Sequence, residues 1–272
     1  MDNYVCRLCV QRHRMQGNGK NVSMNIDLQK PNIWKRISAW MFDMLILVML
    51  VVGIGFVLSA LTGYNEFNDT LQNAYDRYES EYEIEFEITG EEYLAMTEEE
   101  KATYDAAYDA LIKDEAAMYA YNMVLNLTMM IITGSILIGY LILELFVPLK
   151  LGNGQTIGKK VFGIGVMRVD SVQLTTIQLF IRTILGKFTL ETMIPVYIVL
   201  MIFFNIIGIE GTIFMGVFLI VQIVILCVTR TRSGIHDLLA GTVTVDIASQ
   251  KIFKDQEALL EYIKKEHKMG VK

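Results

Sequence analysis

An aspartate inside an apolar stretch is the residue of this sequence that most clearly suggests a chemical role. Asp43 follows Arg36 by seven residues, and seven residues of a helix return to within about 20° of the same face. Trp40 and the small Ala39 fall on the same stripe, and a small residue there lets another helix approach. A charge at bilayer depth costs about 2.5–3.5 kcal/mol, so Asp43 is a candidate site of proton or cation exchange.

Other ionisable residues lie beside apolar runs. Glu144, near the end of the second run, is a candidate partner for Asp43, whereas Glu191 is expected to reach the membrane interface. His236 precedes Asp237 after the last run, but no nucleophile stands at a suitable spacing. We expect this pair to orient a turn, and we predict that the protein is not an enzyme.

The segment Gly154–Lys160 has the glycine and lysine content of a phosphate-binding loop. A P-loop would need glycine where Asn153 stands and serine or threonine where Lys160 stands. The segment therefore fails the motif, and the sequence predicts neither a cofactor nor a metal site.

The composition indicates an integral membrane protein. The chain has 272 residues, of which 53% are hydrophobic and 20% charged, and its mean hydropathy is +0.39. A net charge of −6 gives no support for nucleic-acid binding. Long runs with almost no charge predict transmembrane helices. The fold expected is all-α with four spans, at about 37–61, 121–147, 190–207 and 212–228.

The charges predict the orientation of these spans. Residues 62–120 carry 17 Asp and Glu against three basic residues, while the rest of the chain is basic. The positive-inside rule places both termini in the cytoplasm and the acidic loop outside. We expect the cell membrane, a bacterial plasma membrane, as the location and the lipid bilayer as a partner.

The acidic loop contains two local patterns. Glutamates alternate with other residues over 79–88, which predicts a strand. Thr97 and Glu100 form a capping box for a helix that begins near Glu98 and leads toward the second span with a bend. The loop is either a cation-concentrating funnel or calcium site, or a solvated acidic cap; no calcium-loop pattern is present.

The remaining segments are expected on the cytoplasmic side. Residues 161–170 are β-prone, 176–187 form an interfacial helix, and Ser233 caps a short helix that Gly241 ends. Residues 247–272 form a tail.

Residues 1–30 are predicted to be a disordered extension, with Met24 as a better start than Met1. Cys6, Cys9 and His13 resemble half of a zinc site, but no second ligand pair follows.

These landmarks together resemble the RDD family of membrane proteins, named for one arginine and two aspartates. Arg36 and Asp43 match the first arginine and aspartate, and Asp237 matches the second aspartate within His236–Thr242. Further residues that look like family features are Gly154, Gln155, Thr156, Gly158, Lys159 and Arg182. The resemblance covers residues 31–246 and implies a transport role, including monovalent cation/proton exchange. The acidic loop is longer than is usual in the family, so it inherits no function.

Two functions remain open. In the first, Asp43 exchanges protons for monovalent cations, with Glu144 and Asp237 as partners, in a homo-oligomer because four spans are few for a transporter. In the second, Arg36, Asp43 and Asp237 form a polar clamp that stabilises an accessory protein, whose acidic loop binds a partner.

Overall fold

A computed structural model describes residues 28–203, 206–229 and 233–270. The chain divides into two compact units, one comprising residues 1–49 and 139–272 and the other residues 50–138. The second unit therefore includes parts of two apolar helices in addition to the acidic loop. The predictions for Cys6, Cys9, His13 and Met24 fall outside the described residues.

The first apolar helix, α1, spans Ile33–Thr62. Asn32 precedes it and accepts the backbone N–H of Trp34 through its side chain at 3.2 Å. No proline interrupts the apolar run that follows, so the helix continues well beyond the length needed to cross a bilayer. The predicted first span lies within α1.

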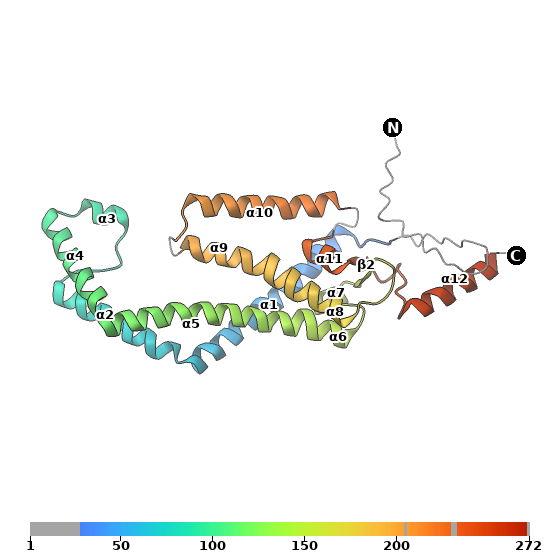
Figure 1. Ribbon diagram of the computed structural model, residues 1–272, viewed down its shortest axis with the longest axis horizontal. Coiled ribbons are helices and arrows are strands. Elements are labelled where there is room, and N and C mark those ends of the chain that lie inside the picture. The colour runs from blue at the N-terminus through green and yellow to red at the C-terminus, as the bar shows by residue number, and fades with distance from the viewer. Residues whose placement is uncertain (1–27, 204–205, 230–232, 271–272) are drawn as a thin grey trace, which may run out of the picture. The chain divides into compact units, whose positions relative to one another are not determined.

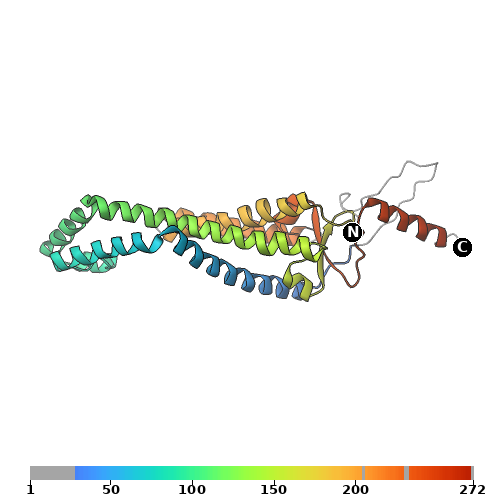
Figure 2. The same ribbon diagram turned by 90° about the horizontal axis from the view of Figure 1, so that it is seen from below.

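The second apolar run folds as one long helix, which Figure 2 shows in green (α5, Glu115–Tyr140; η1, Leu141–Phe146; α6, Val147–Leu151). The segment η1 is π-helical, and Pro148 follows it. Because Pro148 has no backbone N–H, the carbonyl of Glu144 lacks its usual helical partner. The hydroxyl of Thr183 donates to that carbonyl at 2.9 Å, which joins this helix to the next one.

The third apolar helix begins earlier than predicted. Residues Thr176–Phe203 are continuous through α8 (Thr176–Phe180), the π-helical η2 (Ile181–Met193) and α9 (Ile194–Phe203). The separate interfacial helix predicted for 176–187 is therefore wrong. Its charged residues find partners inside the protein, so they do not end the helix at a membrane surface.

A fourth apolar helix, α10 (Ile209–Val228), lies beside α9 (Figure 1). Among the described residues, three helices are long and apolar enough to cross a membrane, namely Ile33–Thr62, Glu115–Leu151 and Thr176–Phe203; the apolar part of α10 is shorter. The fourth span and the orientation of all spans stay predictions.

Two short strands modify the predicted all-α fold. β1 (Ile164–Arg168) pairs antiparallel with β2 (Thr242–Asp246), and Val166 lies opposite Thr244. The β-prone stretch that predicted β1 is confirmed, whereas β2 was not predicted. The described residues are mostly helical, with one small sheet among them.

Short helices flank these strands. They are α7 (Ile157–Val161) before β1 and α11 (Ile235–Ala240) before β2. Gly241 ends α11 in the left-handed conformation with φ 62°, as predicted. The predicted cap at Ser233 is wrong, because the helix begins one residue later and Gly234 is its N-cap.

The C-terminal segment packs onto the rest of its unit. Helix α12 (Gln256–Gly270) buries Leu259 and Ile263 against Val172 and Phe253. Gln29, in the segment predicted to be disordered, donates its backbone N–H to the Gln250 side chain at 3.0 Å.

The acidic loop is helical over residues 79–82 and irregular over 83–88, where a strand was predicted. Helix α2 (Tyr64–Tyr82) covers the first part of residues 79–88 and ends at Glu83, whose φ is 54°. The strand prediction is wrong because Tyr78 and Tyr82 are also four residues apart, a helical spacing, and their rings are 6.5 Å apart. Period-two alternation of glutamates did not exclude a helix.

The rest of the loop consists of two further helices, α3 (Gly90–Ala95) and α4 (Glu98–Lys113). The predicted capping box of α4 is confirmed: Thr97 and Glu100 exchange hydrogen bonds. The chain then breaks at Asp114, whose carboxylate accepts the N–H groups of Ala116 and Ala117 at the start of α5.

Candidate functional site

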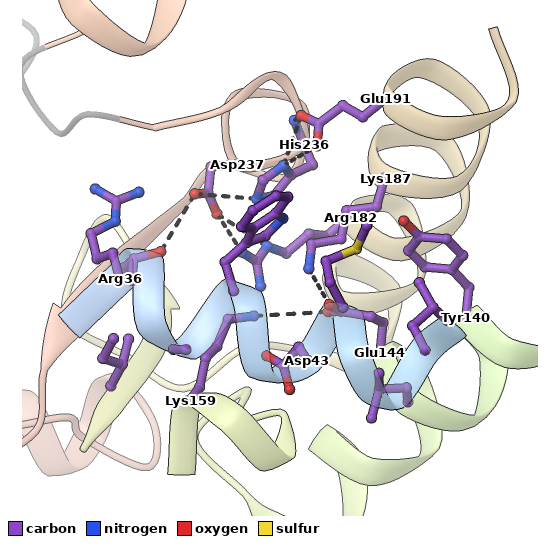
Figure 3. Close-up of a pocket in the computed structure, with 17 residues that line it drawn as sticks. Arg36, Asp43, Tyr140, Glu144, Lys159, Arg182, Lys187, Glu191, His236 and Asp237 are labelled. Atoms are coloured by element: carbon purple, nitrogen blue, oxygen red, sulfur yellow. Dashed lines mark hydrogen bonds and ion pairs between the residues drawn. The ribbon is translucent and has the colours of Figure 1, made fainter. Parts of the chain in front are cut away.

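Most of the ionisable residues singled out in the sequence meet at one cavity of about 190 Å³ in the first unit (Figure 3). Its walls come from α1, the end of α5, η1, α7, η2, α11 and the two strands. Its ionisable lining residues are Arg36, Asp43, Glu144, Lys159, Arg182, Lys187, Glu191, His236 and Asp237. Four are basic and four are carboxylates, so the set is balanced when His236 is neutral.

Asp43 is buried and holds the start of α7. One carboxylate oxygen accepts the backbone N–H of Gly158 at 2.7 Å, and the other accepts the hydroxyl of Thr156. A Cβ at position 158 would lie 2.4 Å from the carbonyl oxygen of Ala39 and 2.9 Å from the Asp43 carboxyl carbon. Glycine at position 158 therefore lets α1 and α7 approach.

The other residues of the Gly154–Lys159 motif shape the turn before α7. Gln155 donates its side-chain amide to the carbonyl of Ile164 at 2.9 Å. Gly154 has φ 58°, and a Cβ there would lie 2.7 Å from the Leu174 side chain. Gln155 and Gly154 therefore hold the local backbone before α7 in place.

Glu144 is buried between two lysines. Its Oε1 accepts a hydrogen bond from Lys187 Nζ, and its Oε2 lies 3.8 Å from Lys159 Nζ. Figure 3 shows both ammonium groups directed toward this carboxylate. Lys187 was not singled out in the sequence.

Lys159 differs from Lys187 in the contacts of its ammonium group. Its Nζ is buried and has no hydrogen-bond partner among the described residues. Burial lowers the pKa of Lys159 to about 7, against the opposing effect of Glu144. The ammonium is thus held by charge across 3.8 Å and by no hydrogen bond.

Asp237 forms the most buried ion pair of the part of the chain that the structure describes. Its Oδ1 lies 3.0 Å from both Nε and a terminal nitrogen of Arg182 and accepts the hydroxyl of Thr242 at 2.7 Å. Thr244 lies at 3.5 Å from the other oxygen. Burial raises the pKa of Asp237, but Arg182, His236 and the Thr242 hydroxyl outweigh this effect and hold the pKa well below its usual range.

His236 and Glu191 form a second pair across η2 and α11. Nδ1 of His236 lies 2.8 Å from both oxygens of Glu191, and its backbone N–H donates to one of them at 3.1 Å. Glu191 therefore has a partner inside the protein, and the expectation that it lies at the membrane interface stays a prediction. Gly186 permits this contact, because a Cβ there would lie 2.5 Å from His236 Cα and Cβ.

Arg36 lines the cavity from α1, as the helical stripe predicted. It lies at the opposite end from Tyr140, and its guanidinium points away from Glu144 (Figure 3). The arginine that pairs with Asp237 at 3.0 Å is Arg182. The structure thus joins Asp43 to α7 and Asp237 to η2.

The sequence did not indicate Lys187 because a helix of regular period separates residues 182 and 187 by about 140°. In η2 the backbone is π-helical, with bonds between residues five apart, and both side chains reach the cavity. A signal was present in Pro195, which follows η2 as Pro148 follows η1. π-helical turns occur frequently at functional sites.

Long apolar helices around a buried set of charges define a helical integral membrane protein. The chain belongs to the RDD family, whose sequence profile matches residues 30–241. Comparisons with curated proteins and with solved structures give no match.

Proposed function

We propose that this protein is a transporter of the cell membrane that exchanges protons for monovalent cations, and that Glu144 is its exchanging carboxylate. The observation that carries the proposal is the position of Glu144, buried in a cavity between the ammonium groups of Lys159 and Lys187. Buried carboxylates on apolar helices mark ion and proton pathways.

Glu144 suits exchange better than the other carboxylates because of its partners. A lysine ammonium can release its proton, whereas an arginine guanidinium stays charged. Asp237 is paired with Arg182, and both oxygens of Asp43 hold α7. This assigns Asp43 a positioning role in place of the carrier role that its sequence position suggested.

The test is proton movement in proteoliposomes after pulses of Na⁺, K⁺ or Li⁺. Glu144→Gln should abolish the signal of the wild type. Glu257→Gln, the same change at an exposed position on α12, should leave it intact. The absence of a signal from folded wild-type protein with all three ions would overturn the proposal.

A second candidate is an accessory protein stabilised by its polar contacts. It is favoured by one observation: Asp43, Asp237 and Glu191 each join two different helices. Under this proposal the acidic loop binds a partner, Asp43→Asn lowers the melting temperature, and no variant changes flux because the wild type has none.

The transport proposal includes a homo-oligomer, since few spans are available in one chain. Light scattering of the detergent-purified protein measures its mass. A monomer that still transports after reconstitution as single copies would remove this part of the proposal.

A further inference from the structure

We propose that the ammonium group of Lys159 is a tethered cation that occupies the place of the transported cation beside Glu144. The side chain would then compete with the substrate, a small monovalent cation such as Na⁺, and set its affinity. This inference rests on the proposed exchange function and adds a second residue to its site.

The two lysines hold Glu144 in different ways. Lys187 donates a hydrogen bond to Oε1, whereas Lys159 Nζ lies 3.8 Å from Oε2, beyond hydrogen-bonding distance. The Lys159 nitrogen is buried and has no hydrogen-bond partner among the residues described. Of the two, Lys159 is the one that a competing cation can displace with the smaller loss of contacts.

The charge balance of the cavity requires that an entering cation replace one of the positive charges already present, because it cannot simply be added to them. Its four basic side chains and four carboxylates are balanced while His236 is neutral. A further cation would leave an uncompensated charge in a buried site, which costs several kcal/mol. An entering cation therefore takes the position of an existing one at Oε2.

The position of Lys159 is set by α1. It follows Gly158, whose backbone N–H is fixed by Asp43 at 2.7 Å, and α7 is a helix of only five residues. The aspartate on α1 thus determines where the ammonium sits, without itself contacting the substrate. Asp43 is a positioning residue, and Lys159 determines affinity.

Equilibrium binding of ²²Na⁺ to the full-length protein in detergent, at one pH below 7 where the Lys159 side chain is charged, tests the inference. Lys159→Gln should bind Na⁺ at least tenfold more tightly than the wild type. Lys160→Gln, the same substitution at the next and exposed position of α7, should bind as the wild type does. A merely structural lysine would give weaker binding, not tighter binding, when removed.

The outcomes separate this inference from the function on which it rests. Equal or weaker Na⁺ binding by Lys159→Gln overturns the tethered cation but leaves exchange at Glu144 in place. No Na⁺ binding by wild type or by either variant overturns the tethered cation for Na⁺, and it overturns exchange as well when Na⁺, K⁺ and Li⁺ all fail to move protons in the proteoliposomes. If Lys159→Gln does not fold, Lys159→Arg should bind Na⁺ at least tenfold more weakly than wild type, and unchanged or tighter binding by that variant overturns the inference.

Discussion

Asp43 and Gly158 are 115 residues apart in the sequence and are joined by a hydrogen bond of 2.7 Å between the carboxylate and the backbone N–H. The bond gives a partner to the N–H of Gly158, because N–H groups in the first turn of a helix have no acceptor within that helix. It also brings α7 so close to α1 that only a hydrogen atom fits on the Gly158 α-carbon. A buried carboxylate thus acts here as a helix cap between distant segments.

The contact between α1 and α7 predicts the effect of Gly158→Ala. The new methyl group would lie 2.4 Å from the Ala39 carbonyl oxygen, so α7 must move and the Asp43 hydrogen bonds must lengthen. Overpacking of this kind costs about 1–3 kcal/mol. A thermal melt of the purified protein should show the melting temperature fall by several degrees.

Gly53→Ala is the matched control, because nothing lies within 4 Å of a Cβ at that position of α1. It should leave the melting temperature unchanged or raise it, since alanine favours a helix by up to about 1 kcal/mol over glycine. Equal melting temperatures for the two variants would contradict the close approach of α7 to Ala39.

Asp237 predicts a pH-dependent loss of stability. Its folded-state pKa lies below the unfolded value of about 3.9, so its contribution is complete above that value and is lost as the pH falls toward the folded pKa. Asp237→Asn should cost about 3–5 kcal/mol at pH 7, because Arg182 is left buried without its partner.

Melting temperatures of wild type and Asp237→Asn between pH 7 and pH 3 provide the measurement. The difference between them should be largest at pH 7 and should narrow below pH 4. A difference that grows on acidification would have the wrong sign for a lowered pKa.

The capping box of α4 predicts that the backbone amides of its first turn are protected from hydrogen exchange. Thr97→Ala removes the acceptor for the Glu100 backbone N–H, at a cost of about 1 kcal/mol. Hydrogen exchange at the start of α4 should accelerate about fivefold. Thr103→Ala, which removes a hydroxyl bonded to a carbonyl within the same helix, should leave those amides as slow as before.

The predicted orientation is testable with single cysteines in a variant that lacks Cys6, Cys9 and Cys227. A membrane-impermeant thiol reagent added to intact cells should label Lys101→Cys in the acidic loop. Lys160→Cys on α7 should react only after the membrane is opened. If both positions are labelled in intact cells, the acidic loop and α7 do not lie on opposite sides of the membrane, and the predicted orientation is wrong.

Local sequence patterns predicted several features of this fold correctly. The apolar runs indicated the long helices, Thr97 and Gly241 marked helix ends, and the helical stripe placed Arg36 and Asp43 on one cavity. These features depend on residues close together in the chain. Where two periods fitted the same residues, as in 79–88, the pattern alone favoured the wrong element.

The partners of the buried charges were decided by the tertiary structure. The residues alone indicated that Asp43, Glu144 and Asp237 needed compensating groups, because a lone charge is costly away from water. They did not show that Asp43 would cap α7, that Glu144 would take two lysines, or that Asp237 would take Arg182.

The physical reason lies in the range of the interactions. Helix periodicity and caps are set by neighbours within a few residues, so the sequence by itself determined that this is a helical membrane protein with buried charges. Ion pairs in a cavity depend on which helices approach, and here glycines, prolines and π-helical turns control that approach. The tertiary structure was needed to show that Glu144 is the carboxylate paired with lysines, whose ammonium groups can release a proton.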